Sequence, residues 1–157
     1  MIFFPFADEN PSSRTPILTW SLIAINVLVF LFQLSLGPSN QLLINEFGVR
    51  PSTFSEFTNL HTIITSAFLH GGFMHLISNM VVLYIYGDNV ESHLGRKNFL
   101  IFYFLGGLCA AYFQSLFAGR PDVPMIGASG CIAAIMGAYF VLYPTARVKV
   151  FVWFLIF

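Results

Sequence analysis

The sequence has 157 residues, of which 57% are hydrophobic and 9% are charged, whereas an average soluble domain is about 25% charged. Its seven basic and seven acidic residues give no net charge and form no cluster, which argues against a nucleic-acid-binding surface or a polybasic lipid-binding segment. We therefore expect an all-α membrane protein that contacts the lipid bilayer and has no nucleic-acid partner.

The amino-terminal third of the chain predicts a tail, one membrane helix and a loop. Residues 1–15 place Asp8, Glu9 and Arg14 before any long apolar run and lack the features of a secretory signal, so we expect a retained cytoplasmic tail followed by a membrane domain over 16–157. Residues 17–36 carry no charge and can cross a hydrocarbon core of about 30 Å as a helix. Residues 41–60 carry scattered charges and predict a partly helical loop outside the membrane.

The uncharged stretch that follows, residues 57–87, is too long for one straight span. We divide it at Gly71-Gly72, which predicts a segment returning toward the membrane and then a second membrane helix over 73–86. Residues 87–97 are polar and predict a short connector.

The remaining sequence predicts two further complete membrane helices. Residues 98–119 form the third, in which Gly106-Gly107 and Ala110-Ala111 are small residues suited to tight helix contact. The fourth begins near Ser129 and ends at Tyr143-Pro144, and residues 150–157 predict the start of a fifth helix. The expected fold is thus a polytopic bundle of four complete transmembrane helices plus the start of a fifth.

Ser129 is the strongest candidate for a catalytic residue. It lies between Gly127 and Gly130 at the start of an apolar helix, where free backbone amides and the helix dipole could receive a developing negative charge. A serine beside glycine in a membrane helix is also a common packing residue, so Ser129 alone does not establish catalysis.

His75 and Asn79 are the polar residues that we expect to lie near Ser129. They are spaced i to i+4, so they share one face of the second membrane helix. With the amino terminus in the cytoplasm, five of the seven basic residues lie inside, and His75 and Ser129 both begin helices near the outer face. Polar groups at such a depth usually mark a cavity or a functional site, although His75 could simply cap a carbonyl.

Other chemistries fit the sequence less well. His61, His70 and His75 lack the i, i+4 pair of the usual helical zinc motif, and we expect neither a metal nor a cofactor. Cys131 occupies the last glycine position of a Gly-x-Ser-x-Gly elbow, which argues against a soluble hydrolase. A transporter or channel would be expected to show internal repeats or a lining of ionisable residues, and neither is evident.

Four stretches together resemble the rhomboid family of intramembrane serine proteases: residues 70–80 (HGGFMHLISNM), 87–95 (GDNVESHLG), 127–130 (GASG) and, as in bacterial members, 8–16. The resemblance covers nearly the whole chain. It implies an endopeptidase that cuts transmembrane segments of other membrane proteins near the outer leaflet, in the inner membrane of a bacterial cell.

The resemblance also implies roles for individual residues. Ser129 matches the nucleophile, His75 and Asn79 match the side chains that stabilise the oxyanion, and Glu91 and Gly95 match positions that support packing.

Rhomboid proteases take their general base from a histidine on a sixth membrane helix, and none of the four histidines matches it. We therefore expect the 157-residue chain to be inactive alone. The alternative is a non-catalytic rhomboid-like protein that binds transmembrane segments of client proteins. The sequence does not indicate an oligomeric state.

Overall fold

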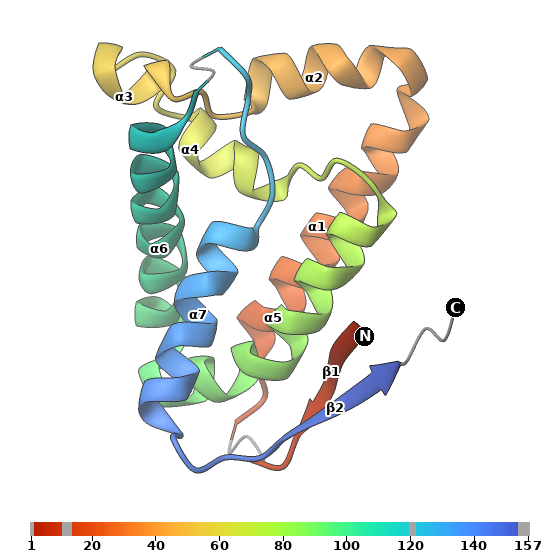
Figure 1. Ribbon diagram of the computed structural model, residues 1–157, viewed down its shortest axis with the longest axis vertical. Helices are drawn as coiled ribbons and strands as arrows, with labels where there is room; N and C mark the ends of the chain where they lie inside the picture. The colour runs from red at the N-terminus through yellow and green to blue at the C-terminus, as the bar shows by residue number, and fades with distance from the viewer. Residues whose placement is uncertain (1, 11–13, 120–121, 154–157) are drawn as a thin grey trace.

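The computed structural model describes residues 2–10, 14–119 and 122–153. Within these ranges the chain forms a helical bundle with one two-stranded sheet at one end (Figure 1). The α-helices are α1 (Ile17–Ser35), α2 (Asn40–Phe47), α3 (Ser52–Glu56), α4 (Thr62–Thr65), α5 (Phe73–Leu94), α6 (Arg96–Phe117) and α7 (Ser129–Leu142). The short 3-10 helices are η1 (Gly37–Ser39) and η2 (Ser66–Phe68), and the strands are β1 (Ile2–Asp8) and β2 (Val148–Trp153).

Among the described helices, α1 and α6 are each long and apolar enough to cross a membrane. The pair formed by Thr62–Phe68 and α5 passes the same test together, with a bend of 98° at the break between them. This bend falls at Gly71-Gly72, where the sequence predicts the chain to turn. Helix α7 has 14 residues, fewer than the roughly 20 that a span needs, so four complete spans remain a prediction.

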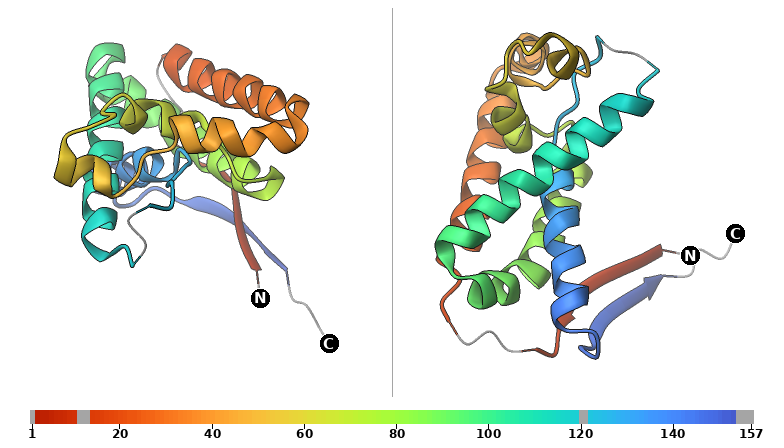
Figure 2. Two further views of the ribbon diagram at one scale, coloured as in Figure 1. Left: turned by 90° about the horizontal axis from the view of Figure 1, so that it is seen from above. Right: turned by 90° about the vertical axis from the view of Figure 1, so that its left-hand side faces the viewer.

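Helix α7 lies between α5 and α6 (Figures 1 and 2). Its contact with α6 is close because small residues face each other: Cβ atoms added at Gly106 and Gly107 would collide with the side chains of Ala134 and Cys131. A Cβ at Gly130 would likewise lie 2.8 Å from that of Ala110. The tight helix contact predicted from these small residues is thus present.

Helices α1 and α5 are joined by a buried carboxylate. Glu91 is 3% exposed and accepts hydrogen bonds from the amides of Leu18 (3.0 Å) and Thr19 (2.8 Å) and from the Thr19 hydroxyl (2.9 Å). An anion at a helix amino terminus satisfies free amides and the helix dipole. Helix α5 continues through Leu94 and α6 begins at Arg96. The connector predicted over 87–97 is thus helical except at Gly95, whose φ is +75°.

The sheet corrects the expectation for the carboxyl-terminal end of the described chain. Strand β2 pairs antiparallel with β1, with Asp8 opposite Val148 and Pro5 opposite Val150. The sequence predicted a fifth helix beginning at residue 150, but alternating, valine-rich residues favour an extended strand when a partner strand is present. Residues 154–157, the remainder of that predicted helix, lie outside the described ranges. The sheet extends away from the helices (Figure 2).

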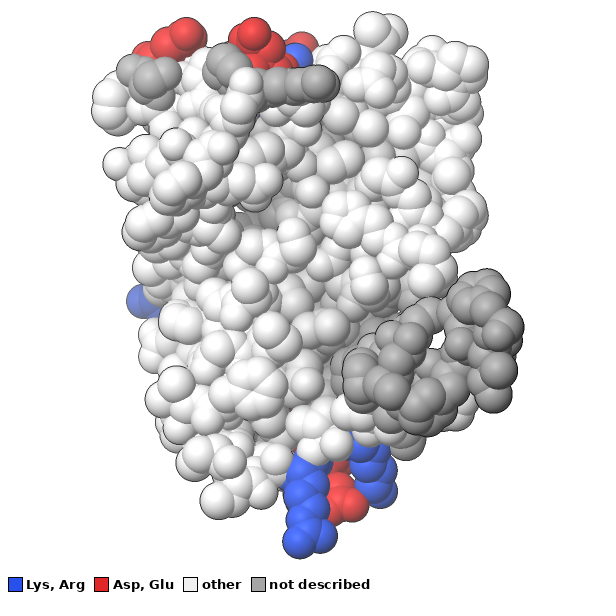
Figure 3. Space-filling model, in the orientation of Figure 1, with Lys and Arg blue, Asp and Glu red and all other residues white. Residues whose placement is uncertain are grey.

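Charged side chains gather at the two ends of the molecule. On the face drawn in Figure 3 a broad uncharged band separates these ends, apart from one basic group at the edge. At one end Arg50 donates to the backbone oxygens of Asn45 (2.9 Å) and Asp122 (3.0 Å). At the other end Lys149 pairs with Glu9 at 3.5 Å. This distribution suits a protein that spans a bilayer.

Candidate active site

The segment that leads into α7 is held by backbone hydrogen bonds. Val49 and Met125 exchange two of them, at 3.1 and 2.7 Å, and the amide of Gly127 donates to the oxygen of Ser66 at 2.9 Å. Ser129 is the first residue of α7, and the amide of Ile132 donates to the oxygen of Ala128, the residue before this helix, at 2.9 Å. The preceding amides of α7 therefore stand where a developing negative charge could be received.

Gly127 lies between His75 and Ser129. A Cβ atom built on Gly127 would lie 2.6 Å from Nε2 of His75 and 3.8 Å from Oγ of Ser129. The two side chains that the sequence singled out on different helices thus border one small volume. Among the described residues no hydrogen bond joins the Ser129 hydroxyl to an imidazole, and this hydroxyl belongs to an exposed residue.

The hydrogen bonds of His75 indicate which ring nitrogen carries the proton. Its Nδ1 accepts from the backbone amide of Gly71 at 3.4 Å. In a neutral imidazole one nitrogen accepts and the other donates, so this contact favours the tautomer with the proton on Nε2, the ring atom nearest the Cβ position of Gly127. The His75 side chain can therefore present an N–H group beside Ser129.

Asn79 lies one helical turn after His75 and is 6% exposed. Its Nδ2 group donates to the backbone oxygen of His75 at 2.9 Å, which uses one of its two N–H bonds within α5. The structure thus brings Ser129 and His75 to the same glycine and ties Asn79 to the backbone of His75.

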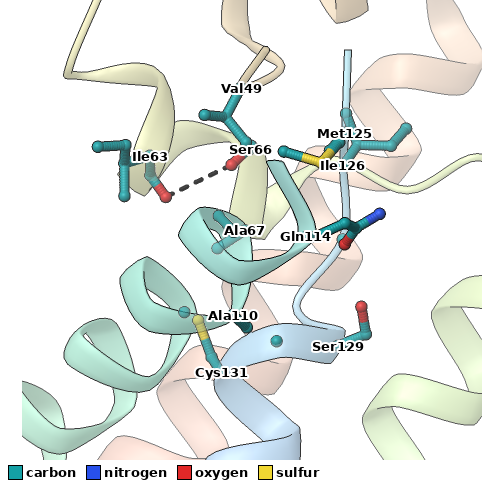
Figure 4. Close-up of a pocket in the computed structure, with 14 residues that line it drawn as sticks. Val49, Ile63, Ser66, Ala67, Ala110, Gln114, Met125, Ile126, Ser129 and Cys131 are labelled. Atoms are coloured by element: carbon teal, nitrogen blue, oxygen red, sulfur yellow. Dashed lines mark hydrogen bonds between the residues drawn. The ribbon is translucent and has the colours of Figure 1, made fainter. Parts of the chain in front are cut away.

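A small pocket opens on the other side of Ser129. It has a volume of about 50 Å³, and its lining includes Ser66, Gln114, Gly127 and Ser129. In Figure 4 the Ser129 hydroxyl points toward the end of α6, where Gln114 lies. A cavity needs about 10–15 Å³ to hold one water, so this polar pocket has room for water next to the serine.

The pocket includes polar residues that sequence reasoning missed. Ser66 and Gln114 were not singled out, although an amide near the end of an apolar helix is an unusual feature. Gln33 was also missed: it is 1% exposed on α1 and bonds to the backbone of His70 at 2.9 and 3.2 Å. Within the described ranges, no group of three or more His, Cys, Asp or Glu residues is placed to hold a metal ion.

Comparison with known proteins identifies the family. The Rhomboid domain model matches residues 58–157. The chain belongs to the rhomboid family. It is 31% identical over 154 residues to Rhomboid protein 1, mitochondrial, of Saccharomyces cerevisiae, covering 95% of the chain and 42% of that protein. It is 29% identical over 124 residues to Rhomboid protease GluP of Bacillus subtilis, covering 78% of the chain and 24% of that protein.

The relatives include proteins named as proteases and proteins named as inactive. Over 103 residues, covering 66% of the chain and 29% of the relative, this rhomboid is 30% identical to Inactive RHOMBOID-like protein 8 of Arabidopsis thaliana. The chain thus spans less than half the length of these relatives. Family membership and the apolar helices make it a multi-pass membrane protein, and its own activity requires a separate argument from its site.

Proposed function

We propose that this rhomboid is an intramembrane serine endopeptidase that cleaves transmembrane segments of other membrane proteins near the outer leaflet. The observation that carries the proposal is that Ser129 Oγ and His75 Nε2 both lie within 4 Å of the point that a Cβ on Gly127 would occupy. A nucleophilic hydroxyl, an N–H donor beside it and free helix amides are the parts that acyl transfer to serine requires.

In this proposal Ser129 Oγ attacks the carbonyl carbon of the scissile peptide bond. The carbonyl oxygen becomes an oxyanion that accepts hydrogen bonds from the first amides of α7 and from Nε2–H of His75. Asn79, one turn further along α5, completes this donor set with its second N–H, since the first is used by the backbone oxygen of His75. Losing one such donor typically raises the barrier by about 3 kcal/mol.

The hydrolytic water requires its own path, and in this proposal it reaches Ser129 through the pocket beside that residue. Its polar lining residues, Ser66 and Gln114, lie at the end of the bundle that carries Arg50 and Asp122. We propose that this end faces the outside, because the other end carries Arg96, Lys97, Arg147 and Lys149 and cytoplasmic loops are richer in basic residues. The amino terminus is then cytoplasmic, and the bilayer is the inner membrane of a bacterial cell.

The proton of Ser129 must pass to a general base, which returns it to the amine that leaves when the C–N bond breaks; water then hydrolyses the acyl-serine. His75 does not suit this role, because its Nε2 already carries a proton while Nδ1 accepts from Gly71. His61 packs against Phe47 and His93 against Tyr143, and the His70 ring, 1% exposed, packs against the ring of His75. We propose that the base is a histidine of a further membrane helix, as the family resemblance implies.

The test is a cleavage assay with the full-length protein in vesicles that contain a membrane-anchored substrate. Ser129→Ala is expected to lower turnover at least about a thousandfold, since the nucleophile is removed. Ser21→Ala is the matched control, because the hydroxyl of that serine donates to the backbone oxygen of Ile17 in its own helix (2.7 Å). Turnover that survives in Ser129→Ala would refute the proposal. Binding of the segment without cleavage by the unmodified protein would instead favour a non-catalytic binder.

A further inference from the structure

Gln33 is a fully buried amide whose hydrogen bonds all lead away from its own helix. Its Nε2 group donates to Oδ1 of Asn40 (3.1 Å) and to the backbone oxygen of His70 (3.2 Å). Its Oε1 accepts from the backbone amide of His70 (2.9 Å). Both N–H bonds and the oxygen are thus used. Gln33 therefore fixes both polar groups of the His70 backbone to α1.

The segment that Gln33 fixes makes two contacts with the imidazole of His75. The next residue, Gly71, donates its backbone N–H to Nδ1 of His75. The His70 ring, 1% exposed, packs edge-on against the His75 ring, with centroids 5.0 Å apart and an angle of 65° between the planes. The orientation of His75 thus depends on where the backbone of residues 70–71 lies.

We infer that Gln33 is a positioning residue for His75. By holding the backbone at His70, it directs the Gly71 N–H to Nδ1, which keeps the ring proton on Nε2 and keeps Nε2 beside Gly127. Without Gln33 the 70–71 segment gains freedom, and the neutral ring can exchange its proton between the two nitrogens. The catalytic consequence rests on the proposed function, whereas the effect on the ring does not.

The test compares two substitutions of buried amides on α1 in the full-length protein. Gln33→Met removes all three bonds and keeps a side chain of similar volume. Asn26→Leu is the matched control: Asn26 is 0% exposed, and its amide donates to the oxygen of Leu22 within α1 (2.8 Å). Ring ¹⁵N chemical shifts, recorded with ¹⁵N-histidine at a pH where the ring is neutral, report the proton position. The His75 signals are assigned with a His75→Gln variant.

We expect Gln33→Met to shift His75 toward a mixture of tautomers and Asn26→Leu to leave the unmodified pattern. For cleavage, Gln33→Met is expected to lower kcat on the order of tenfold to a hundredfold with little change in KM, since misplaced reacting groups slow the chemical step. An unchanged His75 spectrum in Gln33→Met, or an equal shift in both variants, would overturn the inference. If the full-length protein showed no Ser129-dependent cleavage, the spectra would still decide whether Gln33 positions His75.

Discussion

Gly127 must satisfy two constraints that no other residue type meets together. Its φ is +117°, in the region that side chains with a Cβ rarely adopt, and the space that a Cβ would occupy is taken by the His75 ring. A larger residue would therefore strain the backbone and push the imidazole away from Ser129. The absence of a side chain at Gly127 thus leaves room both for Ser129 and for the His75 ring.

We expect Gly127→Ala to lower the free energy of unfolding by about 1–3 kcal/mol and to abolish most turnover of the full-length protein, because the ring of His75 is displaced. Gly119→Ala is the matched control, since a Cβ there meets no described residue within 4 Å, and its stability should stay within about 0.5 kcal/mol. Denaturant unfolding in detergent and the vesicle cleavage assay measure the two effects. Full activity in Gly127→Ala would show that His75 need not lie against residue 127.

At the scale of elements, the bundle is held by polar contacts at one end and by contacts between small residues at its centre. Glycines of α6 and α7 permit close approach without side chains between them. The carboxylate of Glu91, in contrast, joins α5 to the start of α1 by three hydrogen bonds in a buried position. Helix α1 carries Gln33 at its other end, so the anchoring of α1 also affects the site.

Glu91→Gln is expected to lower the free energy of unfolding by about 2 kcal/mol, because an amide replaces one charged acceptor and turns a donor toward the α1 amides. Glu9→Gln provides the control. Its ion pair with Lys149 is about half exposed on both sides, and such a pair contributes less than about 1 kcal/mol. Unfolding of both variants in detergent gives the comparison. Equal losses would mean that the buried carboxylate does not anchor α1.

At the scale of the whole molecule, the sequence predicted what depends on local pattern. Apolar runs located α1, α6 and the turn at Gly71-Gly72, and the i, i+4 spacing placed His75 and Asn79 on one face. The strand at Val148–Trp153 was not predicted, because its partner lies at the opposite end of the sequence. The bonds of Gln33 were missed for a similar reason: periodicity marks a polar residue in a span but not the loop that it contacts.

The last prediction concerns the 157-residue chain by itself. We expect it to fold with Ser129 and His75 in place but to show no Ser129-dependent cleavage, since none of its four histidines is placed to remove the serine proton. A protonated serine is a weak nucleophile. The measurement is cleavage of a membrane-anchored substrate in vesicles, with the full-length protein as the active reference and Ser129→Ala as background. Turnover above that background would mean that His75 accepts the proton through Nε2, and the tautomer inferred from its bond to Gly71 would then be wrong.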